Sequence, residues 1–119
     1  MAVSADPLPV VIHAAVSLDG RATGFAADDA TLRRLAATWP DARLLPAGAP
    51  EAAALLAQGL VTEVSLLIHP VIVGEGHDSW SGGARLPAGL RLVRRSVERV
   101  EPGLAWIRFE VGDAVRPPG

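Results

Sequence analysis

Apolar residues occur along this chain in short blocks that predict alternating strands and helices. Residues 10–16 form an almost continuous apolar run, which is typical of a central parallel strand. Leucines and alanines then recur at helical spacing after Asp28, a residue suited to capping a helix, so we expect a helix over about residues 29–38. Pro40 ends that helix, because proline lacks the backbone N–H that a helix interior needs.

A second strand and a second helix are predicted in the middle of the chain. Residues 42–45 form a short apolar strand that a Pro- and Gly-containing turn interrupts. Pro50 suits the first turn of a helix, and we expect that helix to run to Gln58. Gly59 ends it, because glycine enters the left-handed backbone region without a steric penalty.

The most regular pattern follows Gly59. Residues 62–69 predict a strand buried on both faces, and we expect residues 70–73 to prolong it beyond a bend at Pro70. A glycine-rich loop follows over residues 74–89.

Residues 90–100 and 104–111 predict the two strands of a hairpin, joined by a Glu-Pro-Gly turn. Three strands linked through helices and followed by a hairpin predict an α/β domain with an antiparallel strand at its edge. We expect one domain over residues 1–119, with residues 1–8 and 112–119 flexible. Gly24, in the loop after the first strand, is interpreted as a flexible point.

The composition excludes several functions. The 119 residues are half apolar and carry a net charge of −2, which favours neither nucleic acid nor an anionic membrane as a partner. No cysteine is present, so disulfides, thiolate chemistry and cysteine zinc sites are excluded. Neither a signal peptide nor an apolar run long enough to span a bilayer occurs, and we expect a cytoplasmic protein.

The three histidines show none of the close spacings that bind metals, so we predict no metal site. His13 is interpreted as a core or pocket residue in the first strand. His69 and His77 flank residues 70–76, and either is a candidate acid because histidine titrates near neutral pH.

Two motifs carry a resemblance to a known family. Residues 59–76 read GLVTEVSLLIHPVIVGEG, and residues 17–21 read SLDGR after the first strand. They resemble the "GLVDEL…aPvllG.G" and S-[LV]-D-G-[RK] patterns of the RibD C-terminal family, the riboflavin-biosynthesis reductases with a dihydrofolate-reductase-like fold. The similarity covers residues 12–24 and 44–111. It implies a reduced form of that fold, with a mixed sheet of about five strands and two main helices.

The resemblance also implies a function and a set of site residues. It indicates an NADPH-dependent reductase of a pyrimidine- or pterin-like substrate, with the loop after the first strand beside substrate and nicotinamide. The implied catalytic residues are Ser17 and Asp19. The implied cofactor-binding residues are Ala47, Gly48, Gly74 and Gly76. The substrate-binding candidates are His13, His69 and Trp80, of which Trp80 serves either as a core anchor or as a stacking platform.

This sequence departs from the family pattern in the expected cofactor site. Pro46 stands where the family has a substrate-binding glutamate, and Pro50 stands where a hydroxyl meets phosphate. Glu75 is either a replacement for that glutamate or a solvated residue. The segment that holds the adenosine half of NADPH in the family is absent between the two blocks. The strand at residues 43–46 is then an exposed edge, which predicts a homodimer, with or without exchanged strands.

Three functions remain open. The chain is an NADPH-dependent reductase, a cofactor-free remnant that binds a small molecule or a partner or catalyses a different reaction in the inherited cleft, or a structural subunit that pairs with a full-length homologue. The arginines of the predicted hairpin either meet phosphate or form a solvated face; they are Arg91, Arg94, Arg95 and Arg99.

Overall fold

The computed structural model describes residues 8–80 and 89–112. Its strands and helices lie where the apolar blocks predict them. In chain order they are β1 (Val10–Ser17), α1 (Asp29–Leu35) with the short 3₁₀ helix η1 (Ala36–Thr38), β2 (Arg43–Leu45), α2 (Ala52–Ala57), β3 (Glu63–His69), β4 (Leu92–Val100) and β5 (Leu104–Val111).

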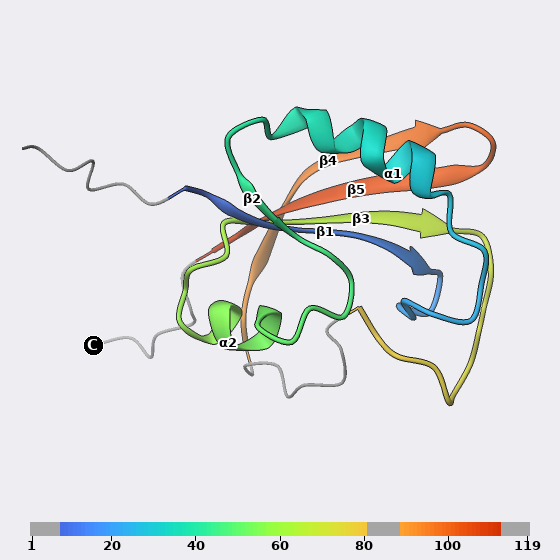
Figure 1. Cartoon of the computed structure of the whole chain (residues 1–119), viewed down its shortest axis with the longest axis horizontal. Helices are drawn as coiled ribbons and strands as arrows, with labels where there is room; N and C mark the ends of the chain where they lie inside the picture. Colours follow the sequence, from blue (N-terminus) through green and yellow to red (C-terminus); the bar gives the residue numbers. More distant parts are fainter. Residues whose placement is uncertain (1–7, 81–88, 113–119) are drawn as a thin grey trace, which may run out of the picture.

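The strands form one five-stranded mixed sheet in the order β2-β1-β3-β5-β4. β2, β1 and β3 are parallel, and β5 pairs antiparallel with both β3 and β4. The prediction that residues 43–46 form an edge is confirmed, since β2 has β1 as its partner in the sheet. The predicted α/β class with a C-terminal hairpin is confirmed as well (Figure 1).

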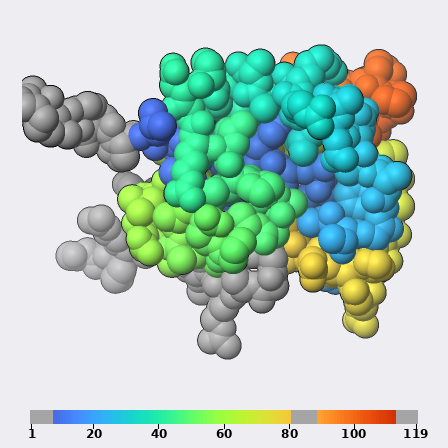
Figure 2. Space-filling view, in the orientation of Figure 1, coloured from blue at the N-terminus to red at the C-terminus, as the bar shows by residue number. Residues whose placement is uncertain are grey.

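The two helices lie on opposite faces of the sheet (Figure 1). The chain moves from β1 to β2 through α1, and then back past β1 to β3 through α2. Crossovers of the same hand that run in opposite directions place their helices on opposite faces. In the space-filling view, atoms of the N-terminal strand remain visible between the two helical layers (Figure 2).

Alternate residues of each strand supply two separate apolar clusters. The cluster on the α2 side consists of Ile12, Leu45, Ala49, Ala52, Leu56, Val61 and Val64. The cluster on the α1 side is smaller; it contains Leu67, Leu104 and Trp106, packed against Leu32, Leu35 and Trp39. Burial of these side chains supplies the main driving force for folding.

Two local predictions are wrong. Residues 70–73 are not a strand, because this segment contacts the loop after β1 instead of a neighbouring strand: the N–H of Leu18 donates to the carbonyl oxygen of Val71 (2.8 Å). The second helix begins at Ala52, two residues later than predicted, because Pro50 and Glu51 lie in the turn before it.

Gly24 is a packed position, so its interpretation as a flexible point is also wrong. Its φ is +90°, and an added Cβ would lie 2.6 Å from Cγ1 of Val73 and 2.7 Å from Nδ1 of His77. Glycine is therefore required here both by the backbone conformation and by the close approach of another segment.

No helix in the described part of the chain is long and apolar enough to cross a membrane. The predicted flexible ends, apart from Leu8 and Gly112, lie outside the described residues.

Candidate functional site

Most of the predicted site residues lie at one edge of the sheet, where the three parallel strands end. The loops that follow β1, β2 and β3 leave the sheet at this carboxyl edge. The crossovers on either side of β1 run in opposite directions, and in open α/β sheets ligands bind outside the carboxyl ends of strands at such a point. We therefore take this edge as the candidate site.

Asp19 joins the loop after β1 to the loop after β3. Its Oδ1 accepts hydrogen bonds from the hydroxyl of Ser17 (2.5 Å) and the N–H of Val73 (3.1 Å), and its Oδ2 accepts one from the N–H of Gly74 (2.8 Å). These hydrogen bonds, that of Ser17 first, lower the pKa of Asp19 well below its usual range. Ser17 is buried and also accepts from the N–H of Arg21 (2.9 Å). Both predicted catalytic side chains are thus engaged in holding two loops together.

Trp80 connects the same edge to the turn after β2. Its N–H donates to the carbonyl oxygen of Gly20 (3.1 Å), and its own carbonyl oxygen accepts from the N–H of Gly48 (2.8 Å). The side chain of Trp80 is half-buried and packs against the apolar cluster on the α2 side. Ala47 precedes Gly48 in this turn, whereas Gly76 is exposed and lies outside these contacts.

His69, at the end of β3, uses both ring nitrogens within the fold. Nδ1 donates to the carbonyl oxygen of Leu67 (3.1 Å), and Nε2 accepts from the N–H of Asp28 (2.9 Å). The ring also lies 5.0 Å from that of Phe25. His69 therefore positions the start of α1, where Asp28 caps the helix by accepting from the N–H of Thr31 (3.0 Å).

His13 lies under α1 and away from the carboxyl edge. A carbonyl oxygen only accepts, so Nε2 donates to the carbonyl oxygen of Leu32 (2.6 Å) and Nδ1 accepts from the hydroxyl of Ser65 (2.9 Å). Trp106 donates through Nε1 to the same hydroxyl (2.7 Å). Burial lowers the pKa of His13, and all the ring's hydrogen-bonding capacity is used inside the fold.

Arg21 is a site residue that the sequence analysis did not single out. Its Nη1 donates to the carbonyl oxygen of His77 (3.0 Å), while its Nε is buried and has no hydrogen-bond partner among residues 8–80 and 89–112. Buried polar atoms without partners are rare in proteins, so this N–H is a candidate donor to a ligand. Its position as the last residue of the SLDGR motif was the available signal. Within residues 8–80 and 89–112, no group of three histidine or carboxylate side chains lies close enough to hold a metal ion.

Comparison with solved structures identifies the fold. A protein from Shewanella sp. PV-4 assigned to riboflavin biosynthesis matches 88% of this chain and 99% of its own, with 13% identity and a TM-score of 0.52. RibD from Acinetobacter baumannii matches 74% of this chain, with 16% identity and a TM-score of 0.51. The chain has a dihydrofolate-reductase-like fold. At these identities the likeness establishes the fold alone.

A pyrimidine reductase-like protein from Corynebacterium diphtheriae also matches 80% of this chain, with 21% identity and a TM-score of 0.49. The chain spans 38% of the length of that protein and 25% of the length of the Acinetobacter RibD. No protein-family model and no curated protein matches the sequence.

The residues of the dihydrofolate-reductase-like fold that would hold NADPH do not fit that cofactor in this chain. The family resemblance implies that the N–H of Gly48 points at a cofactor phosphate. In this structure that N–H already donates a hydrogen bond to the carbonyl oxygen of Trp80. Pro46 and Pro50 offer neither an N–H nor a polar side chain. In addition, α2 has only six residues, so its N-terminus adds little to anion binding.

Proposed function

We propose that this protein binds a small planar molecule at the carboxyl edge of its sheet and does so without NADPH. The observation that carries the proposal is the hydrogen bond from Gly48 to Trp80, which closes the turn where a cofactor phosphate would have to bind. Opening that turn would cost a backbone hydrogen bond before any contact to phosphate could form.

The ligand class follows from two groups at this edge. The buried Nε–H of Arg21, which has no hydrogen-bond partner in the described part of the chain, supports a ligand with a hydrogen-bond acceptor, and the half-buried indole of Trp80 supports one with a flat ring. A pyrimidine or pterin carries both features, in agreement with the family resemblance.

The second candidate is the NADPH-dependent reductase itself. It is favoured by the hydrogen-bonded group at the carboxyl edge in which Ser17 and Asp19 meet Gly74, which lies 55 residues beyond Asp19 in the sequence. The two candidates share a substrate class and differ in whether the cofactor binds.

Binding of pterin and of uracil, followed by calorimetry, tests the ligand class. We expect saturable binding of at least one of them, weakened at least about tenfold by Arg21→Gln. Arg91→Gln is the matched control, because Arg91 is exposed and lies before β4. The proposal fails if neither compound binds, or if both variants weaken binding equally.

We also propose a homodimer that forms through β2. This strand is only three residues long, and the side of it that faces away from β1 has no strand partner among the described residues. Exposed strand edges are commonly covered by association.

A further inference from the structure

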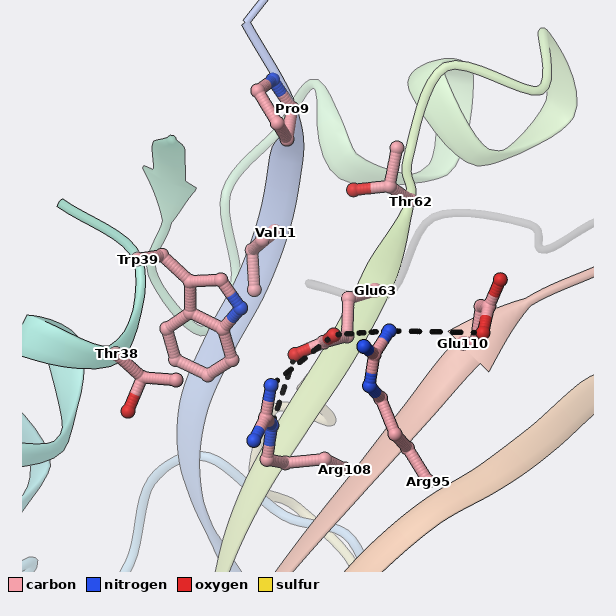
Figure 3. A pocket seen from close by; sticks show the side chains of 9 residues that line it. All are labelled: Pro9, Val11, Thr38, Trp39, Thr62, Glu63, Arg95, Arg108 and Glu110. Carbon is pink, nitrogen blue, oxygen red and sulfur yellow. Dashed lines mark hydrogen bonds and ion pairs between the residues drawn. The ribbon is translucent and has the colours of Figure 1, made fainter. Parts of the chain in front are cut away.

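A pocket lies at the opposite end of the parallel strands from the candidate site. It has a volume of about 400 Å³ and opens on the α1 side of the sheet, where β1 and β3 begin (Figure 3). This volume is within the range of small-molecule sites. Its lining residues come from five separate segments of the chain: Pro9, Val11, Thr38, Trp39, Thr62, Glu63, Arg95, Arg108 and Glu110.

The floor of the pocket is a rigid ion pair. Glu63 is buried, and its carboxylate accepts from Nε of Arg108 (3.1 Å) and lies 3.5 Å from Nη2 of the same residue. The Arg108 guanidinium also stacks on Trp39 (5.0 Å) and Trp106 (5.4 Å). Hydrogen bonds and stacking together fix this arginine, so its charge is compensated from within the protein.

The rim of the pocket is an ion pair that is open to a ligand. Nη1 of Arg95 lies 3.7 Å from Oε2 of Glu110 and 3.8 Å from Oε1 of Glu63, too far for hydrogen bonds. The Arg95 and Glu110 side chains are 56% and 61% exposed. Neither the Arg95 guanidinium nor the Glu110 carboxylate makes a hydrogen bond to the described part of the chain.

A β-bulge directs Arg95 into the pocket. Arg94 pairs with Phe109 and Ser96 pairs with Arg108, so Arg95 is an extra residue without a partner on β5. Bulges often re-aim a side chain in this way. The close-up shows Arg95 between Glu63 and Glu110, with Trp39 and Val11 across the pocket (Figure 3).

The charges select the class of ligand. Two arginines and two glutamates line the pocket. A simple anion that approaches Arg95 is therefore repelled by the Glu110 carboxylate, and a simple cation that approaches Glu110 is repelled by the Arg95 guanidinium. A zwitterion satisfies both members of the rim pair at once. We propose that this pocket binds a free α-amino acid: Arg95 takes the carboxylate, Glu110 takes the ammonium group, and the apolar side chain lies against Pro9, Val11 and Trp39.

The test uses L-phenylalanine as the probe, with calorimetry and two-dimensional NMR of the full chain. We expect saturable binding that shifts the backbone resonance of Glu63 and the indole resonance of Trp39. N-acetyl-L-phenylalanine lacks the ammonium group and L-phenylalaninamide lacks the carboxylate, and each should bind at least about tenfold more weakly.

Two variants and their controls locate the contacts. Arg95→Gln and Glu110→Gln should each weaken phenylalanine binding at least about tenfold. Arg99→Gln and Glu98→Gln should leave it unchanged, because both residues are exposed on β4 and do not line this pocket. Absence of saturable binding, equally tight binding of the acetylated compound, or equal effects of Arg95→Gln and Arg99→Gln would each overturn the proposal. This outcome is independent of ligand binding at the carboxyl edge.

Discussion

The N–H of Gly48 donates a 2.8 Å hydrogen bond to the carbonyl oxygen of Trp80. This bond joins the turn after β2 to a segment that also pairs with the loop after β1, since the N–H of Trp80 donates to Gly20. The turn that the family resemblance assigns to a phosphate is therefore used to hold the carboxyl edge together. The same is true of Asp19, whose two oxygens accept three hydrogen bonds from within the chain.

Asp19→Asn should lower the midpoint of denaturant unfolding. The amide of asparagine replaces one acceptor oxygen with a donor, which then faces an N–H or O–H donor. Asp41→Asn is the control, because Asp41 is exposed and its side chain makes no comparable bond to the described residues. Since the pKa of Asp19 is lowered by folding, its contribution is present above about pH 4, the unfolded value, and is lost as the pH falls toward the lower folded value. Equal midpoints for both variants would show that Asp19 does not stabilise the contact between the loops after β1 and β3.

His13 should make the fold less stable in mildly acidic solution. Folding lowers its pKa, so below about pH 6.5 the unfolded chain takes up a proton that the folded chain does not. The free energy of unfolding therefore decreases as the pH is lowered. His13→Gln should reduce this dependence between about pH 7 and pH 5. Denaturant unfolding at a series of pH values provides the measurement. An unchanged slope in the variant would contradict the assignment of a neutral His13.

Gly24→Ala should destabilise the protein more than Gly76→Ala. Both glycines have a φ of +90°, so both variants carry the cost of a left-handed alanine, about 1 kcal/mol. Only at Gly24 does the new Cβ also meet Val73 and His77. Thermal unfolding of the two variants separates the steric cost from the backbone cost. Equal losses would mean that the loops simply move apart.

A proline at Leu44 tests the homodimer proposed through β2. The N–H of Arg43 donates toward β1, to Pro9, so by alternation the N–H of Leu44 points away from the sheet. Leu44→Pro removes this outward donor and should shift the protein from dimer to monomer, whereas Leu44→Ala retains it and should remain dimeric. Light scattering during size-exclusion chromatography gives the masses. A wild-type monomer of 12.4 kDa would contradict the proposal.

The sheet could be predicted from the sequence because its strands are local apolar blocks bounded by glycine and proline. The exception, residues 70–73, is equally apolar, but its partner is the loop after β1, more than 50 residues away in the sequence. Apolar composition alone does not distinguish a strand from a loop that is hydrogen-bonded to another loop.

The site was predictable only in part for the same reason. The SLDGR and Gly-X-Gly motifs do mark loops that meet. However, whether Asp19 faces a ligand or the N–H groups of Val73 and Gly74 depends on tertiary contacts. The pocket around Glu63 and Arg95 was missed because a shift in register between β4 and β5 creates it. No local pattern indicates such a shift.

Calorimetric titration of the protein with NADPH tests the central claim most directly. We predict no saturable heat of binding up to millimolar NADPH, with or without pterin present, because the Gly48 donor is occupied and two prolines replace polar residues in its turn. We also predict that Pro46→Glu combined with Pro50→Thr does not create binding, since neither substitution frees Gly48 from Trp80. Saturable binding of NADPH to the wild-type chain, with a dissociation constant in the micromolar range, would contradict the account and favour the reductase.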